Sequence, residues 1–240
     1  MKRLIQNLLN KIGFQIKRYP DLDISRRLKL INHYKINKIL DVGANIGQYS
    51  LELRKFGFKG HIISFEPLSG TYSKLKSNAK NDKKWQTFNF AIGNEEGNTL
   101  INVAGNTFSS SINNMLESHL KVEPSSRYIS TENITIKRLD TIFNSIHSSG
   151  DIILLKIDTQ GYEKNVLEGA SQSLDNILLI QLEMSLIPLY ENELILADMI
   201  KFLEQKKFEI VSIENGFTND ETGQLLQVDG IFINKQINID

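Results

Sequence analysis

The chain has 240 residues, of which 40% are hydrophobic, 28 are basic and 28 are acidic, and it contains no cysteine. This length and composition are typical of one globular α/β domain. A formal net charge of zero argues against a dedicated nucleic-acid binder, which normally carries a basic excess. The absence of cysteine excludes disulfides, thiolate zinc sites and cysteine nucleophiles.

The N-terminal segment, residues 1–30, is predicted to be helical and to precede the main domain. Within residues 1–18, apolar side chains recur at helical spacing, and every charged residue before Asp21 is basic. That pattern is typical of a helix that lies on an anionic membrane surface or packs its apolar stripe on protein. No apolar run approaches the roughly 18 residues of a membrane-spanning helix. We therefore expect a cytoplasmic protein, with peripheral membrane contact or homo-oligomer contact through this helix.

Residues 31–240 are predicted to form a single domain, because short apolar runs alternate with helical patterns as in βαβ units. Strands are expected at Lys38–Val42, His61–Phe65, Thr87–Ala91, Ile152–Asp158, Ile177–Glu183, Phe208–Glu214 and Leu225–Ile233. Helices are expected at Gln48–Phe56, Ser69–Lys80, Glu163–Leu174 and Glu191–Lys206. Residues 93–143 break the alternation and predict an insertion, with a hairpin at Thr99–Val103, a serine cluster and a strand at Ile134–Lys137.

The first expected strand runs into a glycine-containing turn, from Asp41 to Gly47, ahead of a helix. In open α/β sheets, ligands bind beyond the carboxyl ends of the strands at such a turn. Gly43 and Gly47 permit a tight turn and the close approach of a bound nucleotide to the backbone. A dinucleotide fingerprint would need glycine at Asn45 and Gln48, and no P-loop sequence occurs. A nicotinamide-dependent oxidoreductase is therefore only the alternative function.

A second acidic residue, Glu66, follows Asp41 by 25 residues and comes directly after the second expected strand. A carboxylate at this place can accept hydrogen bonds from both hydroxyls of an adenosine ribose. The turn and Glu66 together predict a nucleotide-binding site.

Polar side chains also interrupt two later strands that are otherwise apolar. Lys156 and Asp158 share one face of the strand Ile152–Asp158, because side chains alternate in direction along a strand. Gln181 and Glu183 share a face of the next strand in the same way. If these strands are neighbours, the four groups converge at the carboxyl edge of the sheet and indicate an active site. An internal ion pair that serves only stability is the alternative.

Four segments together resemble the FkbM-type S-adenosylmethionine-dependent methyltransferases: Asp41–Gly47, Phe65–Pro67, Ala91–Gly93 and Lys156–Glu163. The resemblance implies a class I methyltransferase Rossmann-like fold, a mostly parallel seven-stranded sheet with an antiparallel last strand and helices on both faces. It also implies S-adenosylmethionine as cofactor and O-methylation of a sugar, glycan or natural-product hydroxyl. Gln160 stands where glutamate is more common in the family.

The same resemblance implies a set of cofactor-binding residues. The loop residues Asp41, Gly43 and Gly47, with Asn45 in place of a third glycine, would bind the methionine half. Glu66 would hold the ribose, the backbone at Ala91 and Ile92 would meet the adenine, and Ser110, in the cluster Ser109–Ser111, would cover the amino-acid end.

For the chemistry, a base that removes the acceptor's hydroxyl proton is expected. Asp158 is the first candidate, Glu183 the second, and Lys156 would position or tune them. The four histidines show no metal-ligand spacing, and only His119, in the insertion, is a further candidate base. A non-catalytic nucleotide-fold module that binds a partner through the N-terminal helix is the alternative from another functional class.

Overall fold

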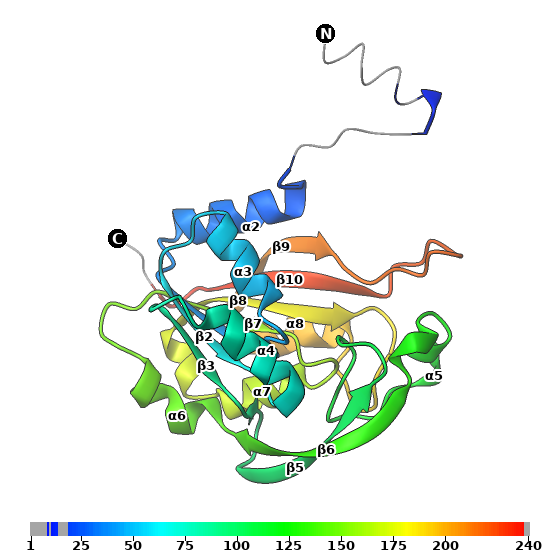
Figure 1. Ribbon diagram of the computed structural model, residues 1–240. Helices are drawn as coiled ribbons and strands as arrows, with labels where there is room; N and C mark the ends of the chain where they lie inside the picture. The colour runs from blue at the N-terminus through cyan, green and yellow to red at the C-terminus, as the bar shows by residue number, and fades with distance from the viewer. Residues whose placement is uncertain (1–8, 10, 14–18, 238–240) are drawn as a thin grey trace.

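The structure is a computed structural model that describes residues 9, 11–13 and 19–237. Its main feature is a seven-stranded sheet with the strand order β3-β2-β1-β7-β8-β10-β9 (Figure 1). The strands are β1 (Lys38–Val42), β2 (His61–Phe65), β3 (Trp85–Phe88), β7 (Ile153–Ile157), β8 (Ile177–Ser185), β9 (Phe208–Asn215) and β10 (Gln227–Asn234). Only β10 runs antiparallel to both of its neighbours. This topology confirms the class I methyltransferase fold expected from the sequence.

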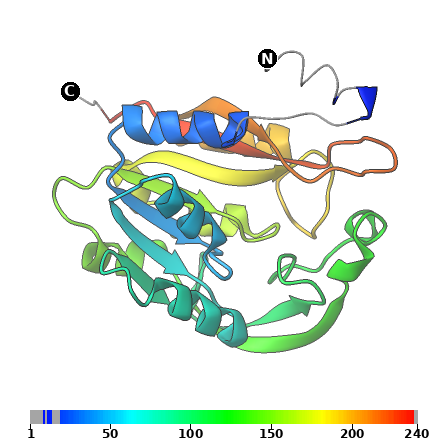
Figure 2. The ribbon, with the colours of Figure 1, turned by 45° about the horizontal axis from the view of Figure 1, so that its top comes forward.

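Helices cover both faces of the sheet, because each face presents its own set of buried apolar side chains. Ile39, Ile62 and Leu154 point to one face and pack with α2 (Leu22–His33), α3 (Gln48–Lys55) and α4 (Ser69–Ala79). The opposite face packs with α6 (Leu139–Ile146), α7 (Glu163–Gly169) and α8 (Leu196–Gln205). Figure 2 shows α2 lying across its face of the sheet. Among the described residues, no helix is long and apolar enough to span a bilayer.

The third expected strand, Thr87–Ala91, is instead divided between two sheets. Strand β3 ends at Phe88, and β4 (Ala91–Ile92) pairs with β6 (Tyr128–Lys137) in a separate three-stranded sheet. Between them, the side-chain amide of Asn89 donates to the carbonyl oxygens of Glu66 and Pro67 at 3.0 and 2.9 Å. These bonds hold the turn that carries the chain from one sheet to the other.

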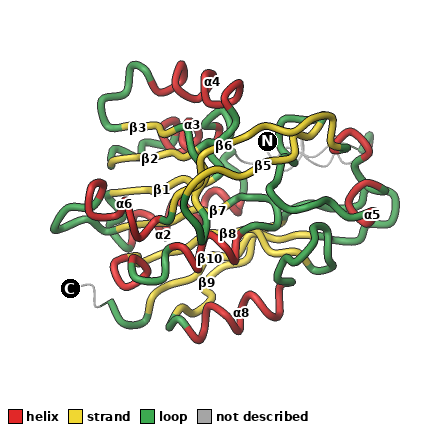
Figure 3. Tube along the Cα trace, turned by 90° about the horizontal axis from the view of Figure 1, so that it is seen from below, coloured by secondary structure: helices red, strands yellow, loops and turns green. Residues whose placement is uncertain are grey.

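The insertion forms a long antiparallel ribbon rather than a short hairpin. Strand β5 (Gly97–Ala104) pairs with β6, and α5 (Glu117–Leu120) and η1 (Pro124–Ser126) lie between them in the chain. The ribbon and α5 lie beyond the carboxyl ends of the central strands, as Figure 1 and Figure 3 show. Helix α6 begins at Leu139, inside the segment expected to be insertion, and was not predicted.

Two helices are shorter than expected. Helix α7 ends at Gly169, whose added Cβ would lie 1.7 Å from the carbonyl oxygen of Gly93, and η2 (Ser173–Asn176) follows. Helix α8 begins at Leu196 rather than Glu191. The carboxylate of Glu193 instead accepts the backbone N–H of Tyr190 at 2.9 Å and fixes the preceding residues as a loop.

The boundary expected after residue 30 falls inside α2, which continues to His33. Asp21 caps this helix by accepting the N–H of Ile24 at 2.9 Å. Ile31 is buried against the sheet, and the guanidinium of Arg27 pairs with Glu214 of β9. Most of the amphipathic helix expected over residues 1–18 lies outside the described residues.

Candidate active site

A cavity of about 270 Å³ lies at the carboxyl ends of β1, β2, β7 and β8, with further walls from β4 and the insertion. Strand β1 lies between β2 and β7, so this is the point where the strand order reverses and where ligands bind in such sheets. Residues singled out from the sequence line it as follows: Gly43, Asn45, Glu66, Ala91, Ile92, Ser110, Asp158 and Glu183. Three others do not line it: Asp41, Gly47 and Lys156.

The two loop glycines serve mainly to pack the protein on itself. Gly43 has a φ of 74°, and an added Cβ would lie 1.8 Å from the carbonyl oxygen of Asp158. Gly47 has a φ of 90° and lies against the side chains of Trp85 and Leu75, away from the cavity. Gly47 therefore does not line the cavity, and its lack of a side chain makes room for the protein's own tryptophan and leucine.

Asn45 occupies the third-glycine position in a left-handed conformation, with a φ of 50°. Asparagine tolerates this region better than most residues with a side chain. Its backbone N–H donates to Oε2 of Glu66 at 2.9 Å, and its side-chain amide donates to the carbonyl oxygen of Thr107 in the insertion. Asn45 thus joins the first loop, the second strand and the insertion at one wall of the cavity.

Glu66 is only 5% exposed, yet its carboxylate lines the cavity. Each oxygen accepts one backbone N–H at 2.9 Å, from Asn45 and from Leu68. Burial raises the pKa of Glu66 to about 7, and the two N–H groups offset only part of that effect. The remaining lone pairs can accept the two hydroxyls of a ribose, as the sequence predicts.

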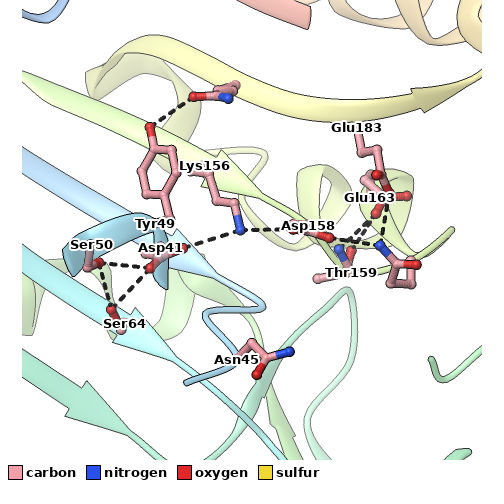
Figure 4. A network of polar contacts seen from close by, with 12 residues as sticks. Asp41, Asn45, Tyr49, Ser50, Ser64, Lys156, Asp158, Thr159, Glu163 and Glu183 are labelled. Carbon is pink, nitrogen blue, oxygen red and sulfur yellow. Dashed lines mark hydrogen bonds and ion pairs between the residues drawn. The ribbon is translucent and has the colours of Figure 1, made fainter. Parts of the chain in front are cut away.

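Asp41, expected to contact the cofactor, is fully buried beneath the cavity. Its Oδ2 accepts hydrogen bonds from Ser50 at 2.9 Å and Ser64 at 3.3 Å, and its Oδ1 lies 3.5 Å from Nζ of Lys156. Figure 4 shows these contacts continuing through Lys156 to Asp158. Asp41 therefore does not line the cavity, and it is placed to anchor Lys156.

Lys156 is the central cation of this network. Its Nζ lies 3.2 Å from Oδ2 of Asp158 and 5.5 Å from the centre of the Tyr49 ring. Burial by itself would lower the pKa of Lys156, but the charges of Asp158 and Asp41 outweigh burial and raise the pKa. The ammonium therefore stays protonated, and its contacts hold it below the cavity wall.

Asp158 and Glu183 meet at one end of the cavity, as expected from neighbouring strands. The amide nitrogen of Gln160 donates to Oδ1 of Asp158 and to Oε2 of Glu183, both at 2.9 Å. The amide oxygen accepts the hydroxyl of Tyr190 at 2.8 Å, which fixes the orientation of the amide. The Asp158 side chain is 38% exposed, so it is open to an acceptor molecule.

Glu183 is the more shielded of the two carboxylates. Burial raises its pKa well above the usual range, and the nearby charges of Asp158 and Asp229 raise it further. Gln227 of β10 also donates to its Oε2 at 3.0 Å. A carboxyl group with a raised pKa at a cavity wall can hold a proton near neutral pH.

The loop after β7 is held in shape by Glu163, at the start of α7. Its buried carboxylate accepts the N–H of Thr159 at 2.9 Å and the N–H of Gly161 at 3.3 Å. Gln160 adopts a left-handed φ of 55°, and a Cβ on Gly161 would lie 2.5 Å from Cβ of Tyr190. The loop therefore presents Asp158 and Gln160 to the cavity in one fixed arrangement.

The insertion places two residues of the serine cluster, Ser110 and Ser111, at the cavity. Ser110 lines the cavity, and its hydroxyl oxygen accepts the N–H of Ala104 at 3.0 Å. Ser111 donates to the carbonyl oxygen of Gln160 at 2.7 Å. The serine cluster is thus tied to the loop that carries the candidate base.

Sequence reasoning did not single out every residue that contacts the candidate site, and one candidate base does not line the cavity. His119 is 3% exposed, packs edge-on against Tyr190 and does not line the cavity. Burial lowers the pKa of His119, which favours the neutral ring. Tyr190 and Asp229 lie on segments with no catalytic motif, so only their tertiary contacts reveal them. For Gln160 the sequence offered one indication: glutamine stands at a position where the family more commonly has glutamate.

Comparison with known proteins identifies the domain. The family model described as "Methyltransferase FkbM domain" matches residues 41–210, which is well over half of the chain. The chain belongs to the FkbM methyltransferase family. This confirms the family, the enzyme class and the cofactor, S-adenosylmethionine, expected from the motifs.

More distant similarities accompany the family match. A protein named "Methyltransferase 1" from Beauveria bassiana (strain ARSEF 2860) is 24% identical over 155 residues, which cover 58% of this chain and 62% of that protein. The chain therefore spans less than two thirds of that relative. The crystal structure of TehB from Haemophilus influenzae is 10% identical, with a TM-score of 0.48 over 88% of this chain and 62% of that one. A Streptococcus agalactiae protein of the NADB-Rossmann superfamily is 16% identical, with a TM-score of 0.45 over 93% and 74%.

The FkbM methyltransferase domain has residues that fit its cofactor. The cavity presents a buried carboxylate, Glu66, with lone pairs free for ribose hydroxyls, and apolar surface from Ala91 and Ile92 for a purine ring. In the part of the chain that the structure describes, no three His, Asp or Glu side chains are grouped as metal ligands.

Proposed function

We propose that this protein is an O-methyltransferase that acts on a hydroxyl group of a sugar, glycan or natural product. The observation that carries the proposal is the pair of carboxylates, Asp158 and Glu183, at one end of the cofactor cavity. S-adenosylmethionine, when bound, would supply a methyl group activated on its sulfonium sulfur; the methyl–sulfur bond would break as the bond to oxygen forms, and S-adenosylhomocysteine would leave. The protein must then align a hydroxyl oxygen and take up its proton.

Asp158 is the proposed base. Its carboxylate is the more exposed of the pair, and its Oδ2 lies 3.2 Å from Nζ of Lys156, which holds it in place at the cavity wall. As the new bond to oxygen forms, the proton of the acceptor hydroxyl passes to this carboxylate. General-base assistance of this kind typically contributes about 10²–10⁴-fold to a rate.

The other polar residues position the reacting groups. Glu183, whose pKa is raised, holds a proton or accepts a hydrogen bond from the acceptor. Gln160 keeps the two carboxylates at a fixed separation, because its amide donates to both. Alignment of the reacting atoms can supply roughly 7–11 kcal/mol of the barrier reduction.

The cofactor roles follow the cavity wall. Glu66 would bind the ribose. Ala91 and Ile92 would contact the adenine. Gly43, Asn45 and Ser110 would contact the methionine part. Asp41 acts from beneath the wall, through Lys156. We further propose a cytoplasmic location, with membrane or homo-oligomer contact through the N-terminal segment.

The experiment replaces Asp158 by Asn, which keeps the shape of the side chain but cannot take up a proton. Methyl transfer should fall about 10²–10⁴-fold. S-adenosylhomocysteine affinity, measured by calorimetry, should remain close to that of the wild-type protein. The melting temperature should change little, because Lys156 keeps Asp41 as a partner. A variant that melts early yet is fully active when folded would refute the base assignment.

Calorimetry also separates the competing functions. No binding of S-adenosylhomocysteine at millimolar concentration would favour the non-catalytic module. Binding of NAD in its place would favour the oxidoreductase.

A further inference from the structure

Phe108, in the insertion, is an aromatic residue at the opening of the cavity. It is 62% exposed to solvent, and it also lines the cavity. Single exposed apolar side chains are common on protein surfaces. Among the described residues, however, the other exposed large apolar side chains do not line the cavity, and two of them, Leu100 and Ile129, lie on the same ribbon. Phe108 is therefore exposed at the place where a bound ligand would meet it.

The segment that carries Phe108, residues 107–111, is fixed to both loops of the site. At one end, the carbonyl oxygen of Thr107 accepts the side-chain amide of Asn45, in the loop after β1. At the other end, the hydroxyl of Ser111 donates to the carbonyl oxygen of Gln160, in the loop after β7, at 2.7 Å. All four of these residues line the cavity. The segment therefore forms a strap along the cavity, between the two loops.

The backbone at Phe108 is held by a local turn. Oδ1 of Asn106 accepts the N–H groups of Phe108 and Ser109 at 3.0 and 2.9 Å. Asparagine side chains commonly fix the backbone of turns in this way. The turn determines where the ring is presented, while most of the ring surface stays in contact with water.

The strap also places Phe108 beside the wall assigned to the cofactor. Phe108 directly follows Thr107, which is bonded to Asn45, and consecutive Cα atoms are only about 3.8 Å apart. The N–H of Asn45 in turn donates to Glu66, the proposed ribose ligand, at 2.9 Å. The ring is thus close to the residues that would bind the ribose and the methionine part.

We propose that Phe108 is a cofactor-binding residue, whose ring packs on the ribose and methionine part of bound S-adenosylmethionine and covers it at the opening of the cavity. This contact removes apolar ring surface from water, and such burial strengthens binding. The cover also keeps water away from the reacting methyl group. The inference rests on the cofactor roles given under the proposed function and is independent of the acceptor.

The variant Phe108→Ala tests this contact. By calorimetry, its dissociation constant for S-adenosylhomocysteine should be roughly tenfold higher than that of the wild-type chain, because the variant loses the apolar surface that the ligand covers. Phe108→Tyr, which keeps the ring, should bind within about twofold of the wild type. The matched control is Ile129→Ala on β6, whose side chain is 70% exposed and does not line the cavity. This control should bind as the wild type does.

The outcomes separate this inference from the proposed function. Phe108→Ala should melt at the wild-type temperature, because the side chain is mostly exposed. If Phe108→Ala binds S-adenosylhomocysteine as tightly as the wild type, the cover is wrong and the cofactor site stands. If the wild-type chain itself binds none, both the cover and the proposed function are wrong.

The variant Phe108→Trp gives a second readout, which does not depend on affinity. The one tryptophan of the natural chain, Trp85, is 6% exposed and does not line the cavity. Saturation with S-adenosylhomocysteine should move the emission of the introduced indole to shorter wavelength and reduce its quenching by acrylamide. The wild-type chain should show neither change. If the introduced indole remains as open to acrylamide with ligand bound as without it, Phe108 does not cover the cofactor.

Discussion

Glu66, the proposed ribose ligand, is buried in a way that costs the fold stability when its carboxylate is ionised. Its carboxylate is buried, and its pKa is raised to about 7 although two backbone N–H groups donate to it. The protein thus keeps an ionisable group where water cannot fully solvate it. The arrangement fits the proposed ribose role, because a ribose supplies two hydroxyl donors.

Cofactor binding should therefore depend on pH. If only the ionised Glu66 accepts the ribose hydroxyls, S-adenosylhomocysteine should bind roughly tenfold more weakly at pH 6 than at pH 8. Calorimetry over that range measures the effect. Glu66→Gln should bind about 1–3 kcal/mol more weakly at pH 8 and lose the pH dependence.

A matched control is available at Glu163. Burial also raises the pKa of Glu163 to about 7, but this carboxylate does not line the cavity. Glu163→Gln should keep the pH dependence of binding. If Glu66→Gln also keeps it, the ribose role of Glu66 is wrong.

At the scale of elements, the loop from Asp158 to Glu163 is held in place by several hydrogen bonds from within the protein. Glu163 accepts N–H groups from Thr159 and Gly161, and Ser111 of the insertion donates to Gln160. A rigid strand end and a cross-braced loop together keep the carboxylates in place without a ligand. Such support from surrounding contacts is what positions reacting groups within a fraction of an ångström.

Helix α2 makes contacts to the domain that do not depend on residues 1–18. The helix carries its own N-terminal cap, Asp21, and its own contact to the sheet through Arg27 and Glu214. Deleting residues 1–18 should therefore leave S-adenosylhomocysteine affinity within about twofold of the full chain, a change of less than roughly 0.5 kcal/mol. The deletion should change either sedimentation with anionic vesicles or the oligomeric state measured by analytical ultracentrifugation. If neither changes, the segment does not make the contacts proposed for it.

For the whole molecule, the buried carboxylates predict how stability varies with pH. The pKa values of Glu66 and Glu163 are raised to about 7 and that of Asp229 to about 6. Between pH 4.5 and 7, the folded state therefore binds more protons than the unfolded state. The free energy of unfolding should fall as pH rises through this window, by up to about 1.4 kcal/mol per pH unit for each group.

Other carboxylates determine how the stability of the fold decreases at acidic pH. Hydrogen bonds and cations lower the pKa of Asp82, Asp140 and Asp151 despite partial burial. Their contribution to the free energy of unfolding is fully present above the usual carboxyl pKa. It is lost as the pH falls through their lowered pKa values. Chemical denaturation from pH 3 to 8 should therefore show maximal stability near pH 4–5. If the free energy of unfolding stays constant or rises from pH 5 to 7, the assignment of buried carboxylates with raised pKa values is wrong.

Much of this protein could be determined from its sequence alone. Strands β1 and β2 have the predicted bounds, because each is a short, mostly buried segment that is rich in apolar residues and ends at a turn. The candidate site segments come at the ends of predicted strands. They are the turn that starts at Asp41, the carboxylate of Glu66 and the polar residues after β7. The family is confirmed, since it is encoded in those local patterns.

Tertiary structure alone decided what these residues touch. Asp41 and Gly47 have the sequence positions of ligand contacts, yet the first is covered by Ser50 and Lys156 and the second by Trp85. Whether a polar side chain faces a cavity depends on the elements packed around it, and these come from distant parts of the chain. The same reason explains why Tyr190 and Asp229 could not be predicted: their roles arise from pairing across strands and loops, which no local pattern records.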